Sequence, residues 1–418
     1  MTGITTTRAG APLPSGAVSP SGRLRFPLVI FAFALCSFAI GTTEFVAIGL
    51  LPEVSDALDI STPMAGHLVS AYALGVVVGA PLMIALGAKL PRRALLLSLM
   101  TLFVLGNVAS ALAPSFGTLF AARVITALPH GAVFGLSAVV AAQLVPAERR
   151  AAAISLAFLG LTLSSCVGAP ASTLVGQQLG YRAAFVMVTI LGLLGLAALL
   201  ATMPRLPRPE GVTLGREADA LLKPRVLVSL SIAIVGFAGI FAAIGYLAPI
   251  LENVTGFSEA SAIWGLSVFG VGMTAGNLLS ARLQRHVTTP RDSAILMARV
   301  LVVFTLVLAA FVGTSHVPVL AVLNVLAIGV VGFSAVPILQ AQLLDMAAAA
   351  PTMASATVHS AFNIGNALGP FAGGLAIDAG LGDASAAGAG ALLSTAGLLI
   401  ALQAIRMAPA TPAAPQPA

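Results

Sequence analysis

The sequence contains few charged residues. They occupy 8% of its 418 positions, whereas hydrophobic residues occupy 58% and the mean hydropathy is +1.04. Soluble domains carry about 25% charged residues, so this composition excludes a soluble globular protein. Aromatic residues are also scarce, at 6%, and the basic residues behind the net charge of +6 are scattered without aromatic neighbours, so no nucleic-acid partner is predicted. We predict an integral membrane protein surrounded by a lipid bilayer.

Cysteine is nearly absent as well. The two cysteines, Cys36 and Cys166, both lie in apolar segments, which excludes a disulfide framework and a metal site of the CxxC type. The motifs of zinc peptidases (HExxH), serine hydrolases (GxSxG) and ATP-driven pumps (Walker A) are also missing. We therefore predict no cofactor, no metal and no enzymatic activity. A membrane-embedded enzyme or a sensor that does not transport is a remote alternative.

Long apolar runs dominate the sequence instead. Runs of roughly 20 residues, enough to cross a bilayer as a helix, predict about twelve spans that a polar stretch divides six and six. The predicted order is a disordered tail at 1–25, a first bundle at 26–203, a linker at 204–225, a second bundle at 226–407 and a disordered tail at 408–418. The spans begin near Phe26, Pro63, Ala94, Phe116, Ala153, Ala183, Val226, Ala260, Ile295, Pro318, Met353 and Ala386.

The positions of Lys and Arg predict the orientation. All but three of the 20 basic residues fall in the tails, the linker or alternate connections between spans. Because basic residues are retained on the cytoplasmic side of a membrane, both termini are predicted to be cytoplasmic, in a multi-pass protein of the cell membrane. The three exceptions are Arg123, Arg182 and Arg299.

The two halves resemble each other at a constant offset of 197 residues. A constant register over several spans indicates internal duplication. Parallel repeats of six spans are how one large class of secondary transporter is built, with the binding site between the repeats. The matching pairs are Pro52 and Pro249, Gly75 and Gly272, Gly79 and Gly276, Gly135 and Gly332, and Gly168 and Gly365.

Four segments together resemble the major facilitator superfamily, and within it the twelve-helix drug:proton antiporters that include chloramphenicol exporters and arabinose-induced exporters. Gly41–Leu58 (GTTEFVAIGLLPEVSDAL) is similar to the first-span signature of that branch, and Ala121–Gly135 (AARVITALPHGAVFG) to its span-four motif. Tyr72–Leu97 lies where the family has a loop motif, and Gly160–Phe185 resembles the antiporter motif of span five. The resemblance implies an all-α fold of two six-helix bundles, alternating access, a small-molecule substrate, coupling to protons and a monomer.

Two of these motifs depart from the family pattern. The loop motif keeps its basic residues but has Ala88 where the family usually has Asp, so the loop lacks the carboxylate that would latch the inner gate. The span-five motif has Ala171 and Ser172 where related exporters often have glycines, which predicts a weaker bend. The retained loop residues are Lys89, Arg92 and Arg93, and the predicted helix-bend residues are Gly168, Pro170, Gly176, Gly369 and Pro370.

Glu44 is the most informative residue, because it is an acid within an otherwise apolar run. Such an acid costs several kcal/mol unless it is paired, protonated or near water, which predicts that it carries the coupled proton. Arg123 lies at a similar depth, roughly 10 Å below the outer end of its span, so we expect the two to interact. His130, two helical turns beyond Arg123, either relays protons, binds substrate or simply bonds to a neighbouring helix. The alternatives are a structural hydrogen bond for Glu44 and a packing brace for Arg123.

Other residues of the spans are candidates for the substrate cavity. Asn363 and Asn366 share one face of span eleven and could offer amides to a polar substrate, with interhelical hydrogen bonding as the alternative. Aromatic residues could contact a flat ligand, although most simply pack. The candidates are Phe45, His67, Tyr72, Phe134, His359, Asn363 and Asn366, with Phe241, Tyr246 and Trp264 as further aromatic contacts.

These features predict a secondary transporter that exports a drug, antibiotic or metabolite in exchange for protons. A sugar or nucleoside exporter or a uniporter on the same fold is the alternative, and the sequence leaves export versus import open.

Overall fold

The computed structural model describes residues 20–205, 214–258, 261, 264–348 and 351–409, and within these residues the secondary structure is entirely helical. The first helix, α1 (Pro20–Gly49), begins before the predicted start at Phe26, and the last, α19 (Ser385–Met407), ends at residue 407. Residues 1–19 and 410–418 of the predicted tails and residues 206–213 of the predicted linker lie outside the described residues.

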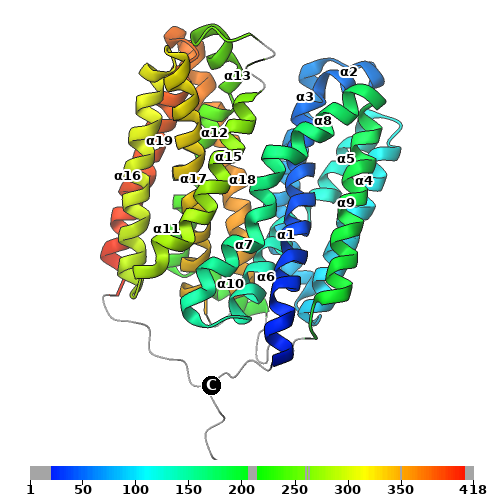
Figure 1. Cartoon of the computed structure of the whole chain (residues 1–418), viewed down its shortest axis with the longest axis vertical. Helices are drawn as coiled ribbons and strands as arrows, with labels where there is room; N and C mark the ends of the chain where they lie inside the picture. Colours follow the sequence, from blue (N-terminus) through cyan, green and yellow to red (C-terminus); the bar gives the residue numbers. More distant parts are fainter. Residues whose placement is uncertain (1–19, 206–213, 259–260, 262–263, 349–350, 410–418) are drawn as a thin grey trace, which may run out of the picture.

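Residues 20–205 form the first half of the molecule, coloured blue to green in Figure 1. Its fourth span consists of α5 and α6, and its fifth of α7 and α8 joined by the π-helical turn η2. The elements after α1 are α2 (Leu51–Leu58), α3 (Thr62–Gly87), α4 (Arg92–Leu112), α5 (Phe116–Ala127), α6 (His130–Gln143), η1 (Ala147–Arg149), α7 (Arg150–Leu163), η2 (Ser164–Gly168), α8 (Ala169–Leu179) and α9 (Tyr181–Thr202).

Residues 214–409 comprise the linker helix α10 and the second half. The first span of this half consists of α11 and α12 joined by the π-helical turn η3. The elements before α19 are α10 (Leu214–Leu221), α11 (Pro224–Ser231), η3 (Ile232–Gly236), α12 (Phe237–Ile244), α13 (Leu247–Pro249), η4 (Ile250–Val254), α15 (Trp264–Leu283), η5 (Gln284–His286), α16 (Pro290–Thr314), α17 (Pro318–Met346), α18 (Pro351–Ala376) and η6 (Ile377–Leu381).

Polar residues in the short connections determine where several helices begin. Ser115 and Thr118 form a capping box at the start of α5, and Thr289 and Asp292 form another at the start of α16. Each box satisfies N–H groups that the first helical turn leaves without a partner. Gly180, just before α9, has a φ of +85°, a conformation that favours glycine.

Within the described residues, ten segments are long and apolar enough to cross a membrane. The other two of the predicted twelve spans are α15 and α18. Both helices pack between the halves, α15 against α7 and η2, and α18 against α3 and α6. The faces of these helices that lie against the other half need not be apolar, which explains why α15 carries the buried Asn277 and α18 the buried His359 and Asn363.

Glycines of the predicted repeat occupy equivalent positions in the two halves. Gly79 of α3 packs against the backbone at Leu128, between α5 and α6, and Gly276 of α15 packs against the backbone at Val330 of α17. In each half the second and fourth spans therefore approach so closely that a side chain would not fit between them. Small residues permit this backbone contact where no hydrophobic effect drives helices together.

One end of the bundle carries the basic connections, including Arg92 and Arg93 at the start of α4 and Arg149 and Arg150 before and at the start of α7. We refer to it as the basic end. The linker helix α10 also lies there, at the lower end of Figure 1. It is the end that the sequence predicts to be cytoplasmic.

The two halves make direct contact towards the basic end. Ser355 Oγ of α18 donates a hydrogen bond to the Gly135 carbonyl of α6 at 3.1 Å, and Asn277 Nδ2 of α15 donates to the Ser155 carbonyl of α7 at 2.7 Å. Towards the opposite end the ribbons of the two halves draw apart (Figure 1). The structure is therefore a conformation in which the halves close on each other at the basic end.

Replacing Gly135 with Ala is expected to destabilise this closed interface. A Cβ at Gly135 would lie 2.5 Å from the backbone nitrogen of Ala356 in the other half, which backbone movement alone can relieve. We expect a loss of about 1–3 kcal/mol, the usual range for overpacking, measured as a lower thermal unfolding temperature of the purified protein. The control is Gly66→Ala in α3, where a Cβ would meet nothing within 4 Å. Equal unfolding temperatures for the two variants would contradict the role of Gly135.

Candidate transport site

Arg123 lies at the centre of a polar cluster in the first half. Its side chain is fully buried, and Nη1 donates a hydrogen bond to the Thr43 carbonyl of α1 at 2.8 Å. The guanidinium carbon stands 4.4 Å from the centre of the Tyr72 ring, which is cation–π distance. Nε and Nη2 have no hydrogen-bond partner. Two donor nitrogens of a buried cation are thus available to a further acceptor.

Glu44 directly follows Thr43, whose carbonyl accepts the hydrogen bond from Arg123. Its side chain is half-buried, and its charge interacts with that of Arg123. Within the described part of the chain, however, no oxygen of Glu44 lies within the 4.0 Å that defines an ion pair with Arg123. In this conformation, Glu44 and Arg123 therefore interact through their charges but do not form the expected ion pair.

A polar connection leads from Arg123 towards the second half. The Tyr72 hydroxyl lies 3.1 Å from Nδ1 of His130, and the His130 ring lies 5.7 Å from the ring of His359 in α18. Phe134 stacks on His359 with ring centres 4.7 Å apart. The sequence predicts Tyr72 as an aromatic contact to a ligand. In the structure its ring contacts Arg123 and its hydroxyl lies within hydrogen-bond distance of His130. His130 and His359, predicted separately, face each other across the interface between the halves.

Several buried polar atoms near this interface lack partners. Besides those of Arg123, they include Nε2 of His359 and Oδ1 of Asn363. Asn363 uses its amide Nδ2 on the His359 carbonyl at 3.1 Å. An unsatisfied buried polar group costs about 1–3 kcal/mol, so such groups usually mark places for water or a ligand. The atoms without partners therefore indicate a binding site, in which a proton, water or substrate would supply the missing hydrogen bonds.

Other predicted cavity residues are not part of this cluster. His67 has an exposed side chain whose Nδ1 lies 3.3 Å from the Met64 carbonyl of its own helix. Phe45 and Asn366 are half-buried. Trp264 is 67% exposed at the start of α15, so it does not line a closed cavity here.

The predicted helix-bend residues pack inside their own halves. Gly168, at the end of η2, lies against Thr42 of α1, and Gly369 lies against the backbone of α12. The helix α18 continues through Pro370, whereas the π-helical turn η2 directly precedes the segment with Pro170. The irregular backbone of span five therefore lies before its proline. The remaining residue, Gly176, lies against Leu50.

The loop-motif residues fasten the basic end of the first half. Arg92 donates a hydrogen bond to Oε1 of Gln143 at the end of α6, and Arg93 Nη2 donates to the Leu200 carbonyl of α9 at 2.8 Å. Lys89 is exposed. Both arginines thus join neighbouring helices within one half.

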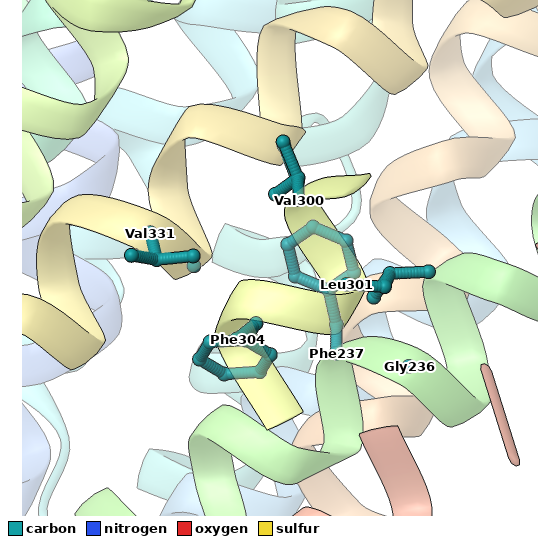
Figure 2. Close-up of a pocket in the computed structure, with 8 residues that line it drawn as sticks. Gly236, Phe237, Val300, Leu301, Phe304 and Val331 are labelled. Atoms are coloured by element: carbon teal, nitrogen blue, oxygen red, sulfur yellow. The ribbon is translucent and has the colours of Figure 1, made fainter. Parts of the chain in front are cut away.

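A small cavity in the second half is not the transport site. It lies between η3, α12, α16 and α17, and Figure 2 shows it lined by Phe237, Val300, Leu301 and other apolar residues. No polar side chain lines it, so it offers nothing to orient a substrate.

Comparison with known families matches residues 33–374 to the Major Facilitator Superfamily. The chain belongs to this superfamily. It is 37% identical over 390 residues to the inner membrane transport protein YdhP of Escherichia coli (strain K12). The aligned region covers 93% of this chain and 98% of that protein. It is 32% identical over 379 residues to a chloramphenicol resistance protein of Streptomyces lividans, which covers 90% and 95%. Among solved structures, the superfamily transporter FucP in the outward conformation matches with a TM-score of 0.71 at 15% identity over 92% of this chain and 99% of that chain.

Membership in the superfamily confirms the predicted fold and the resemblance to chloramphenicol exporters. The chain is a multi-pass membrane transporter with relatives in a bacterial inner membrane. Transporters of this superfamily bind their substrates between the two repeats, and His130 and His359 of this cluster lie on either side of the interface between the halves.

Proposed function

We propose that this superfamily member exports a small organic compound across the cytoplasmic membrane in exchange for protons. The observation that carries the proposal is that Glu44 lies near Arg123, two of whose donor atoms lack partners. From Arg123, Tyr72 and His130 continue to the ring of His359 in the second half. A carboxyl group within a membrane span and near a cation is the kind of group that binds and releases a proton as its surroundings change.

In the proposed exchange, the proton and the substrate compete for one site at Glu44 and Arg123. With Glu44 ionised, its carboxylate and the unpartnered N–H groups of Arg123 bind polar groups of the substrate. Protonation of Glu44 removes this acceptor and releases the substrate, so the proton and the substrate are never bound together. The halves alternate around this site, so the proton and the substrate cross in opposite directions at different times. The hydrogen bond between Tyr72 and His130 would link this site to the interface between the halves.

The name of the chloramphenicol resistance relative supports an organic antibiotic as the class of substrate. The orientation follows from the basic end, which we place in the cytoplasm by the distribution of Lys and Arg. The conformation described here would then be open towards the outside.

Reconstituted transport tests this proposal. Proteoliposomes with an imposed pH difference and clamped membrane potential are mixed with labelled chloramphenicol, followed by a panel of antibiotics, sugars and nucleosides. We expect a transported compound to accumulate on the acidic side, by up to about tenfold per pH unit for one-for-one exchange, and a protonophore to abolish the accumulation. Equal concentrations on both sides despite the gradient would indicate a uniporter and refute proton exchange.

A further inference from the structure

The linker helix α10 is anchored to the basic end by a buried acid. Glu217 is 3% exposed, whereas Asp219 of the same helix is exposed. Acidic residues in connecting segments are ordinarily solvated and are almost never fully buried without a partner. The burial of Glu217 therefore points to specific contacts.

The first contact is with the second half. Oε2 of Glu217 accepts a hydrogen bond from the backbone N–H of Met353 at 2.9 Å. Met353 belongs to the first turn of α18, where N–H groups have no acceptor within the helix and carry a partial positive charge. The carboxylate thus satisfies the start of the helix that packs on α3 and α6 of the first half.

The Glu217 side chain also faces the first half across a cavity. Glu217 and Met353 line one cavity together with Arg92, Ala88 and Leu136, which all belong to the first half. The charges of Arg92 and Glu217 interact. Burial raises the pKa of the Glu217 carboxyl, while the Met353 N–H and the Arg92 guanidinium act in the opposite direction. The carboxylate therefore stands between the start of α18 and the start of α4.

Ala88 is the position where the loop motif lacks its usual acid, and it faces the same cavity. The cavity beside Ala88 thus contains a carboxylate, which comes from Glu217 of the linker helix α10 and not from the loop itself. We propose that the Glu217 carboxylate holds the basic end closed during the transport cycle. It does so by bonding to the start of α18 and attracting Arg92 of the first half. The opening of the basic end then requires α10 to leave α18. The inference rests on alternating access between the halves and does not depend on the substrate or on proton coupling.

Distances between spin labels test this proposal on the full-length protein in lipid nanodiscs. The labels are attached through Glu148→Cys in η1 and Arg285→Cys in η5, two exposed positions of the basic end on opposite halves, with Cys36 and Cys166 replaced by Ala. We expect Glu217→Ala to raise the ratio of open to closed basic ends roughly three- to tenfold, as expected for loss of a charge at a helix start. Asp219→Ala is the matched control and should leave the distances unchanged.

A second variant separates loss of charge from loss of folding. Glu217→Gln keeps the size of the side chain and an oxygen for the Met353 N–H but removes the charge beside Arg92, so we expect a smaller shift in the same direction. Unchanged distances in both Glu217 variants, or the same shift in Asp219→Ala, would overturn the proposal. Because neither substrate nor pH gradient is present, this result is independent of the proton-exchange assay.

Discussion

Glu44→Gln is expected to abolish proton-driven transport. The amide keeps the shape of the side chain but cannot ionise, so it cannot carry a proton between the two sides of the membrane. We expect accumulation driven by a pH gradient to fall to less than about a tenth of the wild-type value, because an acid within a membrane span is rarely idle. The measurement is gradient-driven transport in proteoliposomes with equal amounts of protein.

Exchange of labelled for unlabelled substrate at equal pH separates coupling from binding. This exchange needs no net proton movement, so Glu44→Gln should retain it if the residue serves coupling alone. Asp56→Asn, at an exposed position of α2, is the control and should behave like the wild type. Normal gradient-driven accumulation by Glu44→Gln would remove Glu44 from the mechanism.

Arg123→Met is expected to stop transport without destabilising the protein. Arg123 is fully buried, yet two of its donor atoms, Nε and Nη2, have no partner. A buried donor without an acceptor costs about 1–3 kcal/mol, and Met, which is apolar and of similar length, removes both unpartnered donor atoms. The lost hydrogen bond to the Thr43 carbonyl has a charged donor and contributes about 1.5–3 kcal/mol, so the two effects on stability roughly cancel.

Thermal unfolding and transport measured on the same samples distinguish the two roles of Arg123. For a functional cation, Arg123→Met keeps or raises the unfolding temperature and loses gradient-driven transport. The double variant with Glu44→Gln should then transport no worse than either single variant, because the two residues act as one unit. A clearly lower unfolding temperature with residual coupled transport would identify Arg123 as a packing brace instead.

The sequence was sufficient to predict the fold because length and polarity constrain a membrane chain strongly. Apolar runs must be helical where no water can satisfy the backbone, so the predicted starts at Phe116 and Pro318 coincide with those of α5 and α17. The two spans that are less apolar, α15 and α18, were still recognisable by their length. Their polarity has a tertiary cause, since both lie between the halves.

The candidate site was only partly predictable. Glu44, Arg123 and His130 stand out because ionisable groups are costly in apolar runs, but the sequence gives no indication that Tyr72 bridges Arg123 and His130. It also missed Ser355, Ser360 and Asn277, whose hydrogen bonds join the halves, because serine and asparagine in a span usually bond within their own helix or bundle. The sequence does not predict a role for Glu217, because an acid in a polar linker has no desolvation cost unless the linker is buried.

The sequence by itself determined the helical spans, the basic end, the duplication and the acid in the first span, because each follows from local composition and its cost in lipid. The tertiary structure alone decided which polar groups meet: Arg123 with Thr43 and Tyr72, His130 with His359, and Glu217 with the start of α18. These contacts join residues far apart in the chain, and the packing of helices places them at distances that no periodicity of the sequence encodes.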